Sequence, residues 1–184
     1  MEILVSGETS KLRSVIIGIA DSLGNIPSLK ELYDPKSIEN LNKGTYPLES
    51  DMVKELENFV VLLKKYNVKV YRPNLIKDYN QIFTRDIGFV IDKFFFKSNI
   101  LPKRAKEFQG LSSILSNFHN KIVTMPQNLH IEGGDVLYHS NTIFIGYYDK
   151  DDYSDLFTAR TNKGALDYFI EFFPEKIVKG FHLN

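Results

Sequence analysis

The chain has 184 residues, of which 43% are hydrophobic and 25% are charged, and its 23 basic residues balance its 23 acidic residues. This composition is typical of a globular protein of one or two domains, and its neutral charge does not favour binding to nucleic acid or an anionic membrane. The N-terminus lacks the features of a secretory signal, and no apolar run is long enough to cross a bilayer, so a cytoplasmic location is expected. The absence of cysteine excludes disulfides, thiolate metal sites and a cysteine nucleophile within these residues.

Short apolar strands are predicted at four regularly spaced positions along the chain. They begin near Val15, Val68, Ile122 and Ile177, at intervals of 53, 54 and 55 residues. A fixed period of this length indicates repeated supersecondary units within a single domain over residues 1–184. Each unit has a polar group after its first strand, so units arranged around a common axis would bring these groups together at one end.

Amphipathic helices are predicted between the strands. Apolar side chains recur every three or four positions over residues 48–66 and again over residues 103–119, so that each segment has one apolar face. A third helix is expected to begin at Asn162, a favourable N-cap residue, and to end before Pro174. Strands that alternate with helices in this way indicate an α/β fold.

Two β-hairpins are also predicted, and they exclude a purely parallel sheet. In the first, residues 88–91 and 94–96 flank a turn at Asp92-Lys93. In the second, residues 136–145 contain a turn at Ser140-Asn141.

Acidic residues lie directly in front of both hairpins. Thr84-Arg85-Asp86 precedes the first, and Glu132-Gly133-Gly134-Asp135 precedes the second. Paired glycines weaken a strand and allow the backbone to approach another group closely. Two carboxylates that flank such a pair indicate a binding or catalytic site.

Four short motifs follow one another in an order that resembles a known superfamily. They are FTRD at residues 83–86, EGGDV at 132–136, RTN at 160–162 and FHLN at 181–184. This order resembles the guanidino-group-modifying enzymes, which include arginine deiminase, dimethylarginine dimethylaminohydrolase and amidinotransferases. The resemblance extends over essentially the whole chain and implies the pentein fold, a five-bladed α/β-propeller of ββαβ units. About three and a half of the five units would be present at the observed spacing.

The resemblance also implies the chemistry and the residues that carry it. A cysteine of the family attacks the guanidinium carbon, a histidine transfers protons, and carboxylates bind the planar guanidinium through paired hydrogen bonds. Neither a metal ion nor another cofactor is implied, and the expected partner is a small guanidino compound. The residues matched to the motifs are His182 and Glu132 as catalytic residues, and Asp86, Asp135, Arg160 and Asn184 as substrate-binding residues.

Two departures from the family pattern bear on activity. Asn184 stands where the family usually has a second acid after the histidine, and the nucleophilic cysteine is missing. Five units at the observed spacing would need roughly 270 residues. We therefore expect the chain to be part of a longer enzyme whose cysteine lies beyond residue 184, and to be inactive alone.

Several alternatives remain open from the sequence. The motifs favour a hydrolase of arginine or a related guanidine, but an amidinotransferase and a non-catalytic pentein binding protein also fit. Glu132 and Asp135 could be solvated residues of a glycine turn, and Arg160 could steady the start of a helix instead of binding substrate. Lys103, Arg104 and Lys106 are interpreted as a solvated helix face. The oligomeric state and the particular guanidine are not determined by the sequence.

Overall fold

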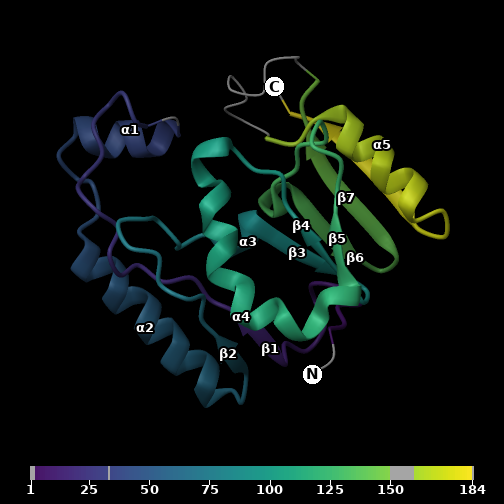
Figure 1. Ribbon diagram of the computed structural model, residues 1–184, viewed down its shortest axis with the longest axis horizontal. Coiled ribbons are helices and arrows are strands. Elements are labelled where there is room, and N and C mark those ends of the chain that lie inside the picture. The colour runs from purple at the N-terminus through teal and green to yellow at the C-terminus, as the bar shows by residue number, and fades with distance from the viewer. Residues whose placement is uncertain (1–2, 33, 150–159, 184) are drawn as a thin grey trace. The chain divides into compact units, whose positions relative to one another are not determined.

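The computed structural model describes residues 3–32, 34–149 and 160–183, which form two compact units (Figure 1). Unit 1 contains the described parts of residues 1–11, 85–108 and 115–184. Unit 2 contains those of residues 12–84 and 109–114. Whether both belong to one domain stays a prediction.

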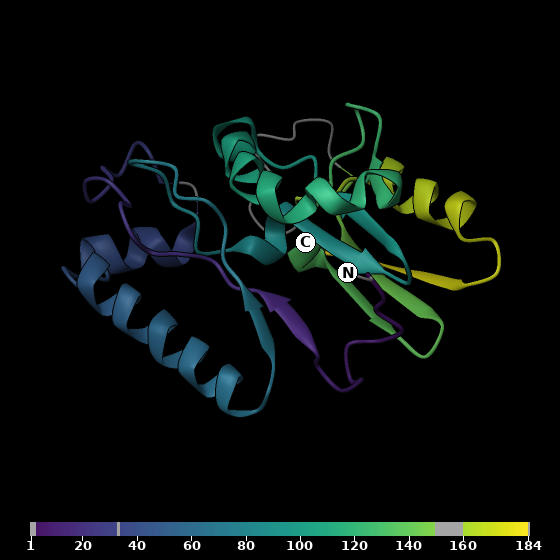
Figure 2. The ribbon, with the colours of Figure 1, turned by 60° about the horizontal axis from the view of Figure 1, so that its bottom comes forward.

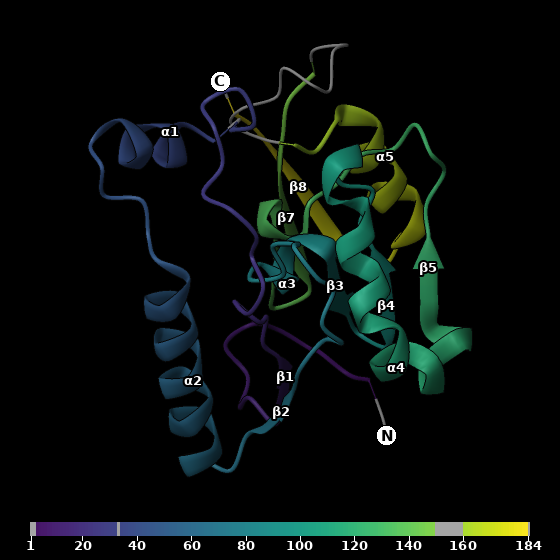
Figure 3. The ribbon, with the colours of Figure 1, turned by 60° about the vertical axis from the view of Figure 1, so that its left-hand side comes forward.

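Unit 2 is built on a pair of parallel strands. Strand β1 (Ser14–Ile16) pairs with β2 (Lys69–Tyr71), with Ser14 opposite Lys69. Helix α1 (Pro35–Asn42) begins after Asp34, whose carboxylate accepts hydrogen bonds from the first turn. Helix α2 (Glu49–Lys65) confirms the helix predicted over residues 48–66, and from its end the chain passes into β2 (Figure 3).

Unit 1 begins with the first predicted hairpin, which the structure confirms. Strands β3 (Gly88–Ile91) and β4 (Phe94–Lys97) are antiparallel, and Asp92 in the turn has a positive φ of 50°. Strand β5 (Ile122–Thr124) adds to β4 in parallel, so the sheet order is β3-β4-β5. The short helix α3 (Thr84–Ile87) directly precedes β3.

The second predicted hairpin is also confirmed and forms a sheet of the same kind. Strands β6 (Val136–His139) and β7 (Thr142–Tyr147) are antiparallel, and β8 (Ile177–His182) adds to β7 in parallel. Ser140 and Asn141 have φ values of 46° and 64°, as a two-residue hairpin turn of this hand requires. Helix α5 (Lys163–Phe172) lies over one face of this sheet (Figure 2).

Both sheets of unit 1 thus follow the order hairpin, helical segment, parallel strand. The strand at each predicted position 122 and 177 completes its sheet. Strand β1 differs, because it pairs in parallel with β2 as β4 does with β5, and so holds the place of a second hairpin strand. The spacing of apolar runs located β1 correctly, but a sequence period contains no information about strand pairing.

The second predicted helix, over residues 103–119, is wrong as a continuous α-helix. The segment consists of the 3-10 helix η1 (Pro102–Leu111), one α-turn, α4 (Ser112–Leu115), and the 3-10 helix η2 (Ser116–Lys121). A 3-10 helix has three residues per turn, so side chains three positions apart lie directly over one another. This geometry determines which side chains of η1 reach the site described below.

The core of unit 1 lies between its two sheets and α5. The three consecutive phenylalanines of β4 were predicted to be core residues, and Phe95 and Phe96 are buried, with Phe96 stacked near Phe169 of α5. Ile131 and Val136, on either side of the EGGD segment, belong to the same core. The acidic segment is therefore fixed at both ends by buried apolar side chains.

Candidate active site

The two acidic motifs of unit 1 meet through their backbones. A Cβ atom placed on Gly133 would lie 2.1 Å from the carbonyl oxygen of Arg85, and one on Gly134 would lie 2.9 Å from Oδ1 of Asp86. Any side chain at these positions would force the segments apart. The two glycines, which begin the 3-10 turn η3 (Gly133–Asp135), thus allow the close approach expected from the sequence.

Arg85 fastens this contact from the other side. Its Nε donates a hydrogen bond to the carbonyl oxygen of Gly133 at 2.8 Å, and its Nη2 donates to Glu8 Oε1 at 2.6 Å. Nη2 also donates to the carbonyl oxygen of Val136. Arg85 is therefore a structural residue that binds the EGGD segment to the segment carrying Asp86.

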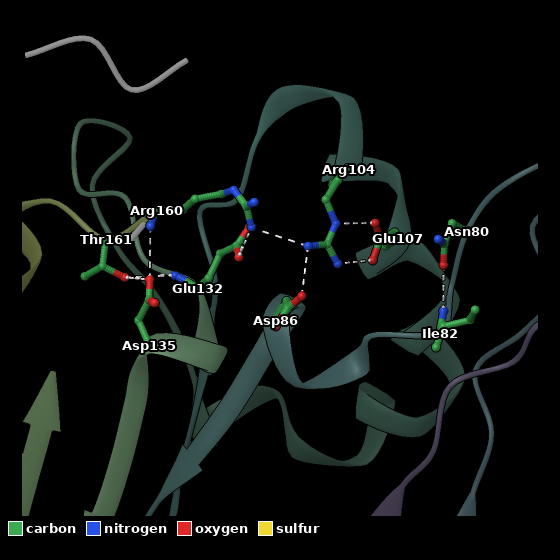
Figure 4. A network of polar contacts seen from close by, with 9 residues as sticks. All are labelled: Asn80, Ile82, Asp86, Arg104, Glu107, Glu132, Asp135, Arg160 and Thr161. Atoms are coloured by element: carbon green, nitrogen blue, oxygen red, sulfur yellow. Dashed lines mark hydrogen bonds and ion pairs between the residues drawn. The ribbon is translucent and has the colours of Figure 1, made fainter. Parts of the chain in front are cut away.

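Asp86 and Glu132 converge on one guanidinium group, that of Arg104 (Figure 4). Arg104 Nη1 lies 2.9 Å from Asp86 Oδ2 and 3.5 Å from Glu132 Oε1. The other oxygen of Glu132, Oε2, accepts a hydrogen bond from Arg160 Nη1 at 2.9 Å. Two of the predicted site acids thus already bind guanidinium groups supplied by the chain.

Arg104 is buried, so its interpretation as part of a solvated face is wrong. Its Nε and Nη2 donate to the two carboxylate oxygens of Glu107 at 2.7 and 2.9 Å. Arg104 is 8% exposed and Glu107 is 3% exposed. The 3-10 geometry of η1 places this pair, three residues apart, on the same side. The opposite charges at this spacing were visible in the sequence, but a solvated α-helical face explains them equally well.

The RTN motif connects the EGGD segment to helix α5. Thr161, which is fully buried, donates its hydroxyl hydrogen to Asp135 Oδ2 at 2.7 Å and accepts the backbone N–H of Glu132 at 3.3 Å. Asp135 Oδ2 also accepts the backbone N–H of Arg160 at 3.1 Å. Asp135 therefore holds the segment from which Arg160 reaches Glu132.

Asn162 confirms the predicted helix cap and has further partners. Its Oδ1 accepts the N–H of Ala165 at 3.1 Å, which caps α5, and the N–H of His130 at 3.2 Å. Its Nδ2 donates to the carbonyl oxygen of Asn128 at 2.9 Å. The same side chain thus fixes both the start of α5 and the segment that leads into Glu132.

His182 lies at the end of β8, with a different described partner from the one expected. Its Nε2 is hydrogen-bonded to Asp149 Oδ1 at 2.9 Å, and the rings of Tyr147 and Tyr148 are each 5.4 Å from its ring. The described partners of Glu132 are Arg104, Arg160 and Thr161. The orientation of His182 by Glu132 stays a prediction, and Asn184 lies outside the described residues.

Burial sets the proton affinities of the acids in this cluster. It raises the pKa of Glu132, although Arg160 and Arg104 oppose the shift. Burial likewise raises the pKa of Glu107 against the effect of Arg104, and that of Asp135 against its hydrogen bond from Thr161. Burial disfavours the charge of Arg104 too, but Glu107 and then Asp86 outweigh it and raise the pKa of Arg104 above its ordinary value. A buried carboxylate cluster of this kind is suited to binding a cation.

Two absences apply to the described residues alone. Within residues 3–32, 34–149 and 160–183, no three histidine, aspartate or glutamate side chains are grouped as a metal site would require. None of the helices in the same part of the chain has the length and apolar character needed to span a membrane.

The fold and the site together define a pentein-like α/β protein of the guanidino-modifying type in its architecture. No family model matches the chain. It is similar in structure to SxtG, an amidinotransferase from Microseira wollei, with a TM-score of 0.70 and 15% identity over 98% of this chain and 62% of that one. It is also similar to dimethylarginine dimethylaminohydrolase from Pseudomonas aeruginosa in complex with citrulline, with a TM-score of 0.65 and 13% identity over 94% and 62%.

Two further relatives complete the comparison. The N-terminal domain of ArgZ, an arginine dihydrolase of cyanobacteria, has a TM-score of 0.70 and 16% identity over 93% of this chain and 58% of that one. The uncharacterized protein YkgA of Bacillus subtilis is 37% identical over 78 residues, which are 40% of this chain and 26% of YkgA. The chain thus spans about three fifths of the similar structures and about a quarter of YkgA. The expected structural similarity to penteins is confirmed over the part of the fold that is present.

Proposed function

We propose that the chain supplies the guanidinium-binding acids and the proton-transfer histidine of an amidinohydrolase acting on arginine or a derivative. One observation carries the proposal: Asp86 and Glu132, from separate motifs, are arranged so that both bind a single guanidinium nitrogen, that of Arg104. A geometry that binds one guanidinium group is suited to binding another.

The charges of the cluster support a cationic substrate. Around Arg104 lie the three carboxylates of Asp86, Glu107 and Glu132, and Arg160 adds the second guanidinium group. This set has an excess of negative charge, and its burial strengthens the attraction for a cation. Asp86 and Glu132 would hold the substrate guanidinium, while Asp135 holds Arg160 in place to contact the remainder of the substrate.

The reaction that this site would serve follows from its family resemblance. A cysteine thiolate attacks the guanidinium carbon, the C–N bond breaks, and the leaving nitrogen takes a proton from His182. Water then releases the carbon from the sulfur after His182 accepts a proton from it. The 184 residues contain no cysteine, so the thiolate must come from polypeptide outside them, and the chain alone is expected to form no product.

Amidino transfer is the second candidate reaction. The TM-score of 0.70 with SxtG, an amidinotransferase, equals that with ArgZ, an arginine dihydrolase. The two reactions differ only in whether water or an amine releases the covalent intermediate. An assay of the complete protein with and without an added amine acceptor, scored by product, would separate them.

Ligand binding by the 184-residue chain tests the proposal directly. L-arginine and L-citrulline form a matched pair, since citrulline replaces the cationic guanidinium with a neutral ureido group. We expect arginine to bind at least about tenfold more tightly, because charge-assisted hydrogen bonds are stronger than neutral ones. Asp86→Asn should remove this preference and Glu39→Gln, an exposed acid of α1, should leave it unchanged. Equal binding of the two ligands by the unsubstituted chain would refute the proposal.

A further inference from the structure

Arg104 has two sets of partners that use different edges of its guanidinium group. Nε and Nη2 are bound side-on by both oxygens of Glu107, at 2.7 and 2.9 Å. Nη1 remains for Asp86 and Glu132, at 2.9 and 3.5 Å. The pair with Glu107 has two short hydrogen bonds with matched geometry, so it fixes the plane of the guanidinium group more firmly than the single contacts of Nη1 do.

The position of Glu107 also determines how much of the Arg104 charge reaches the other acids. The Glu107 side chain is 4% exposed and that of Arg104 is 10% exposed, so the charges of this pair are little screened by water. Without Glu107, the whole positive charge of Arg104 would be neutralised by Asp86 and Glu132. Those acids would then have less negative charge to offer a bound cation.

We propose that Glu107 is a positioning residue for guanidinium binding: it fixes Arg104 beside Asp86 and Glu132 and neutralises its charge, so that these two acids stay available to a cationic ligand. This inference rests on the proposed function and extends it to a residue on η1 that matches none of the four motifs. Glu107 does not touch the ligand in this arrangement, and it acts through Arg104.

The first test needs no ligand. The carboxyl carbon of Glu132 is followed by NMR while the pH is changed, in the unsubstituted chain and in Glu107→Gln. Gln keeps the shape of Glu107 and removes its charge, so Arg104 is released to pair with Glu132, and we expect the pKa of Glu132 to fall. Glu107→Asp keeps the charge on a shorter side chain and should give an intermediate value. An unchanged Glu132 titration in Glu107→Gln would overturn the inference.

The second test measures arginine binding by the same chains. Glu107→Gln should weaken binding about tenfold, the effect of losing one buried charged hydrogen-bonding group. Glu39→Gln is the matched control, because it removes an exposed glutamate charge of α1. A shifted Glu132 titration with unchanged arginine binding would overturn the inference. If the unsubstituted chain binds no guanidine, the proposed function fails, and the titration alone still decides whether Glu107 positions Arg104.

A double variant distinguishes positioning from a purely structural role, and it also serves if Glu107→Gln does not fold. Arg104→Met combined with Glu107→Met removes both charges and keeps similar volume, a change that buried ion pairs often tolerate. With no Arg104 to occupy Asp86 and Glu132, the double variant should bind arginine more tightly than Glu107→Gln or, where that variant is unfolded, within about threefold of the unsubstituted chain. Binding weaker than either reference would show that Glu107 serves only the fold.

Discussion

Gly134 lies so close to Asp86 that a Cβ atom on it would be 2.9 Å from the Asp86 carboxylate. Its neighbour Gly133 lies against backbone instead, with the Arg85 carbonyl oxygen 2.1 Å from the corresponding position. The glycine pair thus has two separate purposes. One glycine allows the segments to meet, and the other leaves room for a site acid.

Alanine substitutions should separate these purposes. Gly133→Ala meets rigid backbone and should destabilise the chain by about 2 to 4 kcal/mol. Gly134→Ala meets a movable side chain, so it should cost less stability but displace Asp86 and weaken arginine binding. Urea unfolding and arginine titration of both variants check this. The interpretation is wrong if Gly134→Ala is the more destabilising of the two.

The buried hydroxyl of Thr161 gives a second prediction. Thr161→Val is nearly isosteric but removes the partner of both Asp135 and the Glu132 N–H, which are then left unsatisfied in a buried place. We expect a loss of about 1 to 3 kcal/mol in unfolding free energy. Thr45→Val, at an exposed threonine of unit 2, is the control and should change stability by less than about 0.5 kcal/mol. Equal effects in both variants would count against the network.

The pH dependence of stability should reveal the cost of burying Glu132. Burial raises the pKa of this carboxyl in the folded chain, so the folded state binds more protons than the unfolded state. Its stabilising contribution is therefore fully present below the ordinary value of 4.5 and is lost as the pH rises through the higher folded value. Relative to Glu132→Gln, the unsubstituted chain should lose stability as the pH is raised from 4.5 toward neutrality.

Glu39 provides a control of opposite sign for this measurement. Hydrogen bonds from Lys36 and Lys43 lower the pKa of Glu39, so its contribution is present above the ordinary value and is lost as the pH falls. Urea unfolding at a series of pH values should therefore give differences of opposite slope for Glu132→Gln and Glu39→Gln. Parallel slopes would contradict the assigned effect of burial.

Kinetics of the complete protein should divide the roles of the two site acids. In Glu132→Gln an amide replaces the predicted partner of His182, and it cannot stabilise the imidazolium that forms when His182 takes a proton, so kcat should fall more than KM rises. Asp86→Asn removes charge that faces the guanidinium in the ground state and the transition state alike, so mainly KM should rise. An unchanged kcat with a raised KM for Glu132→Gln would make Glu132 a substrate-binding residue only.

The features that the sequence predicted correctly are those that depend on neighbouring residues. The Ser140-Asn141 turn, the Asn162 cap and helix α2 follow from local preferences, and the structure contains all three. The close approach at Gly133 and Gly134 could also be foreseen, because few other circumstances require two adjacent glycines before a strand.

The features that the sequence did not reveal depend on contacts between distant segments. Arg104 reaches Asp86 and Glu132 across 18 and 28 positions of the chain, and only the 3-10 form of η1 directs it there. Asp149 is 33 positions from His182 and belongs to none of the four motifs. A charged residue on a polar helix gives no local sign of burial, so Arg104 was assigned to solvent.

Asn162 gives the site an unexpected dependence on the hydrophobic core. One amide fixes the start of α5 and also the backbone at His130 and Asn128, just before Glu132. Helix α5 is itself seated by the buried Leu166 and Phe169. A change of size among these apolar side chains would tilt the helix start and move Arg160 against Glu132 without altering any charged group. Substrate preference in such a protein can therefore evolve through substitutions in its apolar interior.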